Sequence, residues 1–312
     1  MKRFLLQRLS FLALSVFGAF TIAFLVMRLI PGDPAQVMLG DYATQESIAR
    51  LRETLGLERP VWMQYASFVG RALRGDFGQS LVTQRPAFYE VFAVFAPTMQ
   101  LAAAGALVSM LLGIPAGIVA AARRNRPLDY VTTTLALGGM SMPVFWLGLL
   151  LLFLFSFTLG WTPTIGAGAE GGWLSTLHHI LLPALALGLS LGAMVTRMTR
   201  SAMLEVIRQD YIRTARAKGL SELLIIAKHA LRNAALPIVT IVGINFGIQL
   251  GGTILVETVF ARPGMGSLLI SSIYQRDYPQ VQALVVVFAT SIVLVNVLVD
   301  VLYAAFDPRV RA

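Results

Sequence analysis

A short basic segment near residue 215 carries the pattern that most clearly indicates function, because small side chains precede a sharp turn there. Thr214, Ala215 and Ala217 are small, and Gly219 is able to adopt the left-handed conformation that commonly ends a helix. A chain of this shape forms a narrow knuckle that suits a cleft on another protein. The segment is therefore predicted to bind another protein and transmit movement, not to catalyse a reaction. The alternative interpretation is a solvated linker whose charges only orient the chain in a membrane.

The surrounding stretch, residues 197–233, is polar and basic and is patterned as two helices. The first is predicted from about 201 to 218, with two cations in its last turn, where they interact favourably with the helix dipole. A serine is expected to cap the second helix, and a glutamate lies in its first turn. The residues that shape the turn are Arg216, Lys218, Gly219, Ser221 and Glu222.

Catalytic groups are scarce, which excludes several classes of function. The sequence has no cysteine, and its lysines, Lys2, Lys218 and Lys228, do not stand in a nucleotide-binding glycine loop. No histidine falls within an apolar stretch to act as a base, so an intramembrane hydrolase is not supported. His178 and His179 are adjacent, but a metal site needs three or more convergent ligands. We therefore expect a non-enzymatic chain with no metal and no cofactor of its own.

The fifth apolar stretch of the chain has glycines at four-residue spacing, Gly243, Gly247 and Gly251. Because four residues turn a helix by about 400°, these glycines form one nearly straight groove along which another helix can approach closely. Asn245 and Gln249 lie on a neighbouring stripe, and their amides need polar partners in hydrocarbon. Helix packing is the default interpretation of this pattern, and lining of a translocation path is the functional alternative.

All these residues must be positioned by a membrane protein. The 312 residues are 56% hydrophobic and 13% charged, with a mean hydropathy of +0.72, which is too apolar for a soluble domain. A bilayer core of roughly 30 Å needs about 20 apolar residues per helix. We predict an all-α, polytopic fold with six transmembrane helices, the third tilted or broken at Pro143. The apolar windows are 9–27, 99–122, 130–159, 180–196, 234–256 and 281–303.

The distribution of basic residues predicts the orientation of these helices. Of the 25 lysines and arginines, 16 lie in the N-terminus, the 123–129 loop, the 197–233 loop and the C-terminal tail, which together carry a net charge of +11. The positive-inside rule therefore places both termini in the cytoplasm. The net charge of +9 follows from this topology and does not require a nucleic acid partner. The first apolar run exceeds the usual length in signal peptides, so it is interpreted as a retained helix.

The longest segment outside the predicted spans is 31–96, which is extracytoplasmic in this topology. Apolar residues recur there at spacings of three and four, on either side of Gly56–Pro60, which predicts two short amphipathic helices. We interpret their stripes as packing or interfacial anchoring rather than a ligand site. The stripe residues are Ile48, Leu51, Leu55, Trp62, Tyr65, Val69 and Leu73.

Several motifs, taken in order, resemble one family over nearly the whole chain. Residues 211–220 read YIRTARAKGL and residues 229–237 read HALRNAALP, which is similar to the coupling loop of ATP-binding cassette importer permeases of the dipeptide and oligopeptide branch. The generic importer loop opens with Glu-Ala-Ala, whereas Arg213, Thr214 and Ala215 stand here, and this departure favours the peptide branch. Supporting motifs are PGDP at 31–34, GDFGQS at 75–80, SMPVFW at 141–146, ETVF at 257–260, PGMG at 263–266 and RDYP at 276–279.

The resemblance implies that residues 1–312 form a single importer transmembrane domain of the bacterial inner membrane, the first or B-type of two permease subunits. Its partners would be a second, homologous permease in a heterodimer, two ABC ATPase subunits that bind Mg-ATP, an extracytoplasmic substrate-binding protein and membrane lipid. Closure of the ATPases would act through the 211–222 loop and open a path for peptides. The implied coupling residues are Tyr211, Arg213, Thr214, Ala215, Arg216, Ala217, Lys218, Gly219, Ser221 and Glu222.

Four charged residues lie close to the outer ends of the fifth and sixth spans, namely Glu257, Arg262, Arg276 and Asp277. They are predicted to act as an extracytoplasmic gate or as docking contacts for the binding protein. Local salt bridges among them are an alternative, and contact with the ammonium group of a peptide is a third.

The alternative hypothesis is that the chain is a self-sufficient, ion-coupled secondary carrier or a channel. The long basic inner loop and the scarcity of carboxylates within the spans favour a driven permease, because a proton-coupled carrier needs buried acids.

Overall fold

The computed structural model describes residues 2–29, 34–39, 44–168 and 171–306. This part of the chain is helical throughout, apart from turns and one isolated bridge between Gln79 and Pro86. It divides into two compact units. The first comprises Thr98–Pro263 and the chain from Val295 onward, and the second comprises Lys2–Pro97 and Gly264–Leu294.

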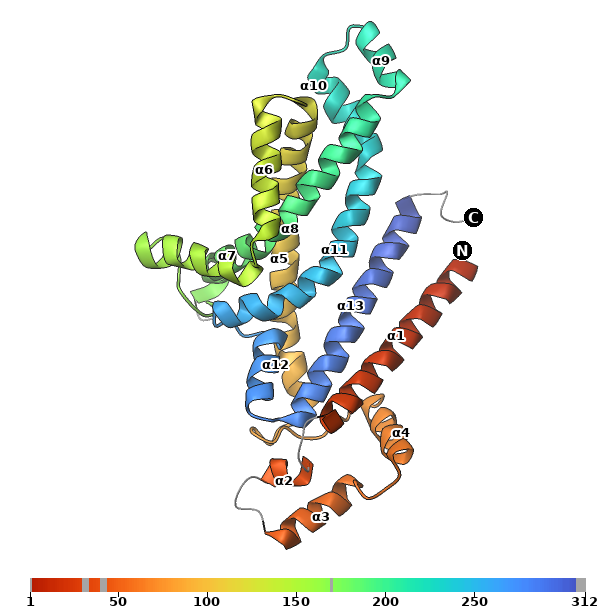
Figure 1. Cartoon of the computed structure of the whole chain (residues 1–312), viewed down its shortest axis with the longest axis vertical. Coiled ribbons are helices and arrows are strands. Elements are labelled where there is room, and N and C mark those ends of the chain that lie inside the picture. The colour runs from red at the N-terminus through yellow and green to blue at the C-terminus, as the bar shows by residue number, and fades with distance from the viewer. Residues whose placement is uncertain (1, 30–33, 40–43, 169–170, 307–312) are drawn as a thin grey trace. The chain divides into compact units, whose positions relative to one another are not determined.

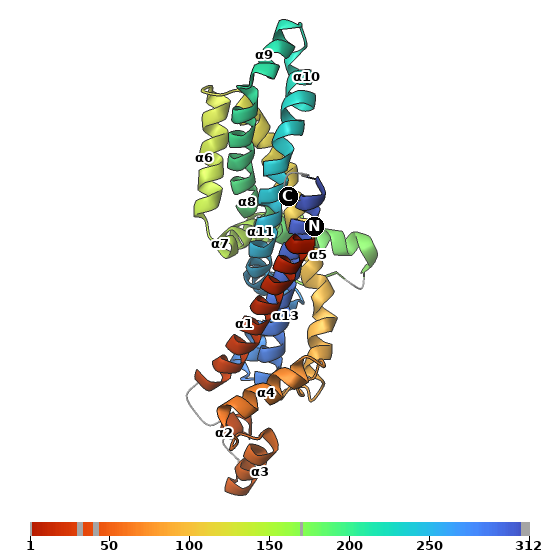
Figure 2. The ribbon, with the colours of Figure 1, turned by 90° about the vertical axis from the view of Figure 1, so that its right-hand side faces the viewer.

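The first unit contains most of the long helices. They are α5 (Ala87–Ala122, from residue 98), α6 (Pro127–Ser141), α7 (Val144–Leu151), α8 (Gly172–Ile207), α9 (Asp210–Ala217), α10 (Glu222–Leu224), α11 (Leu231–Val259) and the end of α13 (Tyr278–Phe306). Two π-helical segments, η1 (Leu152–Thr158) and η3 (Ile225–Ala230), continue α7 and α10. Helix α8 is central, with α6 and α11 running beside it in both views (Figures 1 and 2).

Glycines allow α5 and α8 to approach closely. A Cβ atom added to Gly113 would lie 2.7 Å from the carbonyl oxygen of Gly192, and one added to Gly117 would lie 2.6 Å from that of Thr196. Since both obstacles are backbone atoms of α8, a side chain at either position would force the helices apart. Small residues in membrane helices commonly allow such close packing, and here they hold α8 against α5.

The second unit contains α1 (Lys2–Leu29), α2 (Pro34–Leu39), α3 (Gln45–Leu55), α4 (Val61–Ala72), the start of α5, α12 (Met265–Tyr274) and most of α13. Helix α4 packs on α1 through aromatic rings, and the hydroxyl groups of Thr21 and Tyr65 are 2.8 Å apart. The stripes of α3 and α4 thus belong to two helices, separated at Gly56 with φ +65°. The extracytoplasmic location of 31–96 stays a prediction.

Within the described residues, four helical stretches are long and apolar enough to cross a membrane: α5, α8, Pro237–Val259 of α11 and Tyr278–Val299 of α13. Helices α6 and α7 with η1 qualify together, but they are bent by 106° at Met142–Pro143. The break at Pro143 is therefore confirmed. In α1 the apolar stretch among the residues whose burial is described, Ser10–Leu25, is shorter than the others. Six crossings with cytoplasmic termini stay a prediction.

Candidate functional site: the α8–α11 connection

The segment between α8 and α11 differs from its expected secondary structure. A single helix was predicted from 201 to 218, but α8 continues to Ile207 and a new helix, α9, begins at Asp210. The break falls at Gln209, whose backbone is extended with φ −70° and ψ 148°. With 36 residues, α8 is about 54 Å long, well beyond the roughly 30 Å of a bilayer core. Helix α8 is therefore longer than a bilayer crossing requires, and α9 follows close to its C-terminal end (Figure 1).

Helix α9 is held by its apolar face. Ile212 and Ala215 are three residues apart, so they lie on one side of the helix. Both are buried in a cluster with Met203 of α8 and with Ile225 and Ala230 of η3. The cluster anchors α9 to the ends of the two long helices that enter and leave the segment.

The burial of Ala215 changes the interpretation of the predicted knuckle. The residue is 8% exposed and packs against the rest of the chain, whereas Thr214 and Ala217 are exposed. Because residues 214 and 217 lie on a different face of the helix from 212 and 215, only the former can face another protein. The small size of Ala215 allows α9 to sit close to the cluster.

A left-handed glycine and an ion pair define the turn after α9. Gly219 has φ +79°, and its N–H donates to the carbonyl oxygen of Arg216 at 2.9 Å. The guanidinium Nε of Arg216 lies 2.6 Å from Glu222 Oε1, which bridges the turn on its exposed side. Ser221 occupies the N-cap position of α10, but its hydroxyl makes no capping hydrogen bond, so that detail of the prediction is wrong.

The other predicted coupling residues lie on the outer face of this segment. Asn233 of α11 donates from Nδ2 to the Tyr211 hydroxyl at 2.7 Å, which ties α9 to α11. Arg213 pairs with Asp210 at 3.5 Å, and both side chains are exposed. Lys218 is also exposed.

Sequence reasoning missed three leucines around the turn. Leu220, Leu223 and Leu224 are 36%, 80% and 40% exposed. Exposed apolar side chains grouped on a polar loop mark a contact surface more strongly than charges do, because water does not stabilise them. The run of apolar residues after Glu222 was the available signal.

The glycine stripe of α11 is partly filled by its own chain. The hydrogen position of Gly243 faces Val299, and a Cβ at Gly247 would lie 2.8 Å from Asn296 Oδ1, so α13 packs closely at both. Among the described atoms, nothing lies within 4 Å of a Cβ added at Gly251. Helix packing is thus the arrangement at the first two glycines, and Gly251 faces open space within the described part of the chain.

The two amides beside that stripe are buried. Asn245 is 4% exposed and donates from Nδ2 to the carbonyl oxygen of Ile241 at 2.7 Å. Gln249 is 5% exposed and lies against Gly105 of α5, and its amide nitrogen and oxygen have no hydrogen-bond partner among the described atoms. A buried amide without a hydrogen bond raises the free energy of the folded protein in an apolar setting. This favours a hydrogen-bond partner outside this chain, such as water or solute.

The outer charged residues are mostly buried. In the first unit, Thr98 donates its hydroxyl to Glu257 Oε1 at 2.6 Å, and Arg262 is 2% exposed. Burial lowers the pKa of Arg262, while the nearby Glu257 carboxylate acts in the opposite direction. In the second unit, Asp277 is 2% exposed and accepts a hydrogen bond from the Ser80 hydroxyl.

Arg276, by contrast, is exposed and has φ +55°. In the described conformation it alone of the four is open to a partner. The roles of gate and docking contact stay predictions for all four residues.

The histidines predicted to be weak metal candidates make local contacts. His178 Nε2 lies 2.8 Å from the carbonyl oxygen of Trp161, and His179 Nδ1 lies 2.8 Å from that of Ser175. Among the described residues, no group of three or more potential ligands of the His, Cys, Asp or Glu type gathers.

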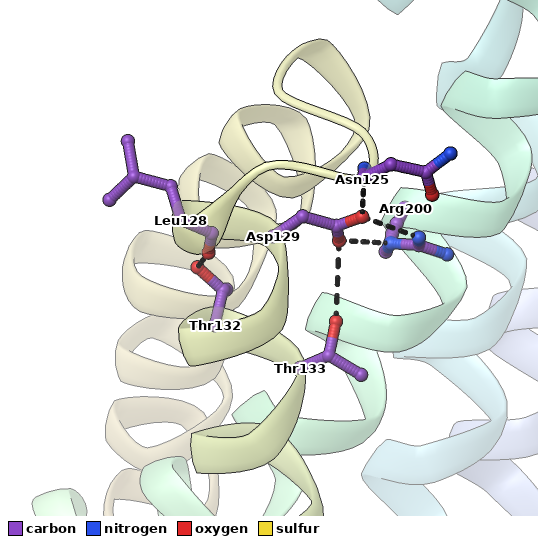
Figure 3. Close-up of polar contacts among 6 residues, drawn as sticks. All are labelled: Asn125, Leu128, Asp129, Thr132, Thr133 and Arg200. Carbon is purple, nitrogen blue, oxygen red and sulfur yellow. Dashed lines mark hydrogen bonds and ion pairs between the residues drawn. The ribbon is translucent and has the colours of Figure 1, made fainter.

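An ion pair that the sequence did not single out joins α6 to α8 (Figure 3). Arg200 approaches Asp129 with Nε at 2.6 Å from Oδ1 and Nη2 at 2.8 Å from Oδ2. Asp129 is 2% exposed although it is charged. Charge counting treated both residues only as determinants of orientation, since nothing local in the sequence pairs positions so far apart.

Comparison with known proteins agrees with this architecture. Residues 113–312 match the family described as binding-protein-dependent transport system inner membrane component, and residues 1–102 match its N-terminal region. The glutathione transport system permease protein GsiC of Escherichia coli (strain K12) is 42% identical over 311 residues, covering 100% of this chain and 99% of the relative. GsiC of Salmonella choleraesuis (strain SC-B67) is 44% identical over the same coverage.

The di/tripeptide transport system permease protein DppB of Pseudomonas aeruginosa (strain UCBPP-PA14) is 41% identical, again with 100% and 99% coverage. Among solved structures, an inward-facing MetNI methionine ABC transporter aligns with a TM-score of 0.59 and 19% identity, over 71% of this chain and 98% of that chain. This likeness concerns the fold alone. The sequence relationships extend over the full length, and the chain therefore belongs to the multi-pass inner membrane permeases of ABC importers of the peptide family.

Proposed function

We propose that this chain is one of two permease subunits of an importer that moves dipeptides, oligopeptides or related small solutes across the bacterial inner membrane. The observation that carries the proposal is full-length similarity to permeases named for glutathione and for di- and tripeptides. Relatives with different named solutes at nearly equal identity favour a substrate class, and the substrate-binding protein is expected to select within it.

The proposed partners follow from the family. Two ABC ATPase subunits would bind and hydrolyse Mg-ATP, and an extracytoplasmic binding protein would deliver solute. A second, homologous permease would complete the path, with α11 on its border. Gly251 and the amide of Gln249 support this placement, because no described atom lies within 4 Å of a Cβ added at Gly251 and no described group forms a hydrogen bond with the Gln249 amide. This chain would perform no catalysis itself.

Coupling is proposed to act through the 211–222 loop. The exposed groups, with Thr214, Ala217 and Leu223 among them, would contact an ATPase subunit. The buried side, with Ile212 and Ala215, would pass the displacement to α8 and η3, since all of these pack in one cluster. A packed cluster of this kind moves as a body rather than deforming.

The test is transport by the reconstituted assembly. The permease should co-purify with its ATPase partners, and peptide uptake into proteoliposomes should require ATP and withstand an ionophore. Uptake by this chain alone, driven by an ion gradient, would establish the carrier alternative instead.

A substitution pair tests the docking surface within the same assay. Leu223→Ser removes the most exposed leucine of the loop and should weaken retention of the ATPase subunit. Leu73→Ser, which changes a leucine 70% exposed beyond α4, is the matched control and should leave retention unchanged. Equal retention in both variants would remove Leu223 from the proposed interface.

A further inference from the structure

The pair formed by Asp129 and Arg200 lies where the α5–α6 turn, α6 and α8 meet (Figure 3). Asp129 is in the first turn of α6, and its Oδ2 also accepts the backbone N–H of Asn125 at 2.9 Å. The hydroxyl of Thr133, one turn along α6, lies 3.4 Å from Oδ1. One carboxylate therefore gathers donors from the turn, from α6 and from α8.

The geometry of this contact restrains orientation as well as distance. The guanidinium Nε donates to one carboxylate oxygen and Nη2 donates to the other. These two parallel hydrogen bonds fix the plane of the guanidinium group against the carboxylate. The carboxyl side chain is 3% exposed and the arginine side chain 28%, so water competes little for the pair. Surface pairs such as Arg213 with Asp210, 79% and 95% exposed, lack this restraint.

Arg200 stands between two contacts that fix the end of α8. Thr199 packs against Gly117 of α5, where an added Cβ would lie 2.6 Å from the Thr199 Cβ. Met203, three residues further on, belongs to the buried cluster that holds Ile212 and Ala215 of α9. The ion pair adds α6 to this set of supports, at the level where α8 leaves α5 and approaches α9.

We propose that Asp129 and Arg200 are positioning residues for coupling: their ion pair fastens α8 to α6 so that a displacement of α9 moves both helices together. Without it, α8 would bend between its contacts with α5 and α9, and the displacement would not reach the path. The pair stays closed throughout the cycle, because opening it would leave a buried carboxylate without its cation. The inference rests on the proposed coupling role of the 211–222 loop.

Two single variants of the reconstituted complex test it. Asp129→Asn keeps the shape and removes the charge, and Arg200→Lys keeps the charge and removes the fork. Each should lower solute imported per ATP hydrolysed by about fivefold or more, a change in the range of ordinary inter-site coupling. ATP hydrolysis and complex yield should persist. Glu205→Gln, an exposed charge on the same helix, is the matched control and should leave the ratio unchanged.

Cross-linking distinguishes a permanent brace from a contact that must open. The chain has no cysteine, so Asp129→Cys with Arg200→Cys offers a unique pair of thiols. Joining them with a short bifunctional methanethiosulfonate should restore the solute-to-ATP ratio, and a reductant should abolish it again. A cross-linked transporter that is inactive until reduced would overturn the proposal.

The remaining outcomes separate this inference from the function beneath it. If the wild-type complex is active and Asp129→Asn imports the same amount of solute per ATP hydrolysed, the proposed role of the ion pair is overturned and the proposed function is not. Parallel loss of hydrolysis, uptake and thermal stability means that the pair serves folding only, which also overturns it. Absence of ATP-dependent uptake by the wild-type complex would instead refute the proposed function.

Discussion

At Gly219 the backbone has φ +79°, a conformation that costs roughly 1–2 kcal/mol for residues with a Cβ. No described atom lies within 4 Å of a Cβ added at Gly219, so the requirement for glycine there is conformational and not steric. The turn it makes brings Glu222 back to Arg216. At the residue scale, then, one dihedral angle determines the direction in which the chain leaves α9.

Gly219→Ala should therefore distort the turn without a clash. We expect uptake per ATP to fall, with the permease still inserted and folded. Gly138→Ala provides the control, because Gly138 is a helical glycine with open space around it, and alanine favours a helix by about 1 kcal/mol. Full activity of Gly219→Ala would show that the direction of the turn is unimportant.

Ala215 and Ala217 allow packing to be separated from docking. Tryptophan at the buried position 215 should overpack the cluster and destabilise the permease by about 1–3 kcal/mol. Tryptophan at the exposed position 217 should leave the melting temperature unchanged and block association with the ATPase. Thermal unfolding and co-purification of the two variants measure these effects. Loss of stability in Ala217→Trp, or normal association, would contradict the proposed surface.

At the scale of elements, α8 organises the first unit because each neighbouring helix contacts it through a different kind of interaction. Small residues admit α5, the ion pair of Arg200 holds α6, and Leu187 packs in a buried cluster with Val256 of α11. Helix α8 thereby connects the membrane part of the unit with α9.

The α5–α8 contact should be the least tolerant of added volume. Gly117→Ala directs a methyl group at the carbonyl oxygen of Thr196, which belongs to the α8 backbone and cannot rotate away. We expect a destabilisation of about 1–3 kcal/mol, seen as a lower thermal midpoint in detergent. Gly251→Ala enters open space and should unfold like the wild-type chain. Equal midpoints in the two variants would show that α5 and α8 separate easily.

At the scale of the whole molecule, the path of α6 and α7 determines how many times the chain crosses the membrane. The bend of 106° between α6 and α7 is compatible with a broken span or a re-entrant loop. The distribution of basic residues favours the broken span, because it keeps the basic 123–129 and 197–233 loops on one side.

Single cysteines decide between these topologies, since the chain has none of its own. A cysteine at position 125 should be labelled by an impermeant maleimide only from the cytoplasmic side. One at Gly166, after η1 and before α8, should be labelled only from outside. Cytoplasmic labelling at 166 would show that α6 and α7 turn back within the membrane.

Sequence alone determined the class of fold and the family, because these follow from local quantities. Apolar windows long enough for a bilayer, the asymmetry of basic residues and ordered motifs do not depend on what lies nearby in space. The break at Pro143 has a local signal in the sequence, because proline lacks the N–H that would continue the helical hydrogen bonds, although Pro183 and Pro237 lie inside α8 and α11. The single helix predicted at 201–218 was wrong because the break at Gln209 has no proline or glycine to signal it.

Only the tertiary structure decided which side chains face inward. Ala215 and Ala217 have the same chemistry, and they differ because one faces the cluster of Met203 and Ile225. Asp129 and Arg200 are both ordinary loop charges in the sequence, and folding brings them into an ion pair whose carboxylate is 3% exposed. Burial and pairing depend on the packing of α6, α8 and α9 in space, and such long-range contacts leave no periodic trace along the chain.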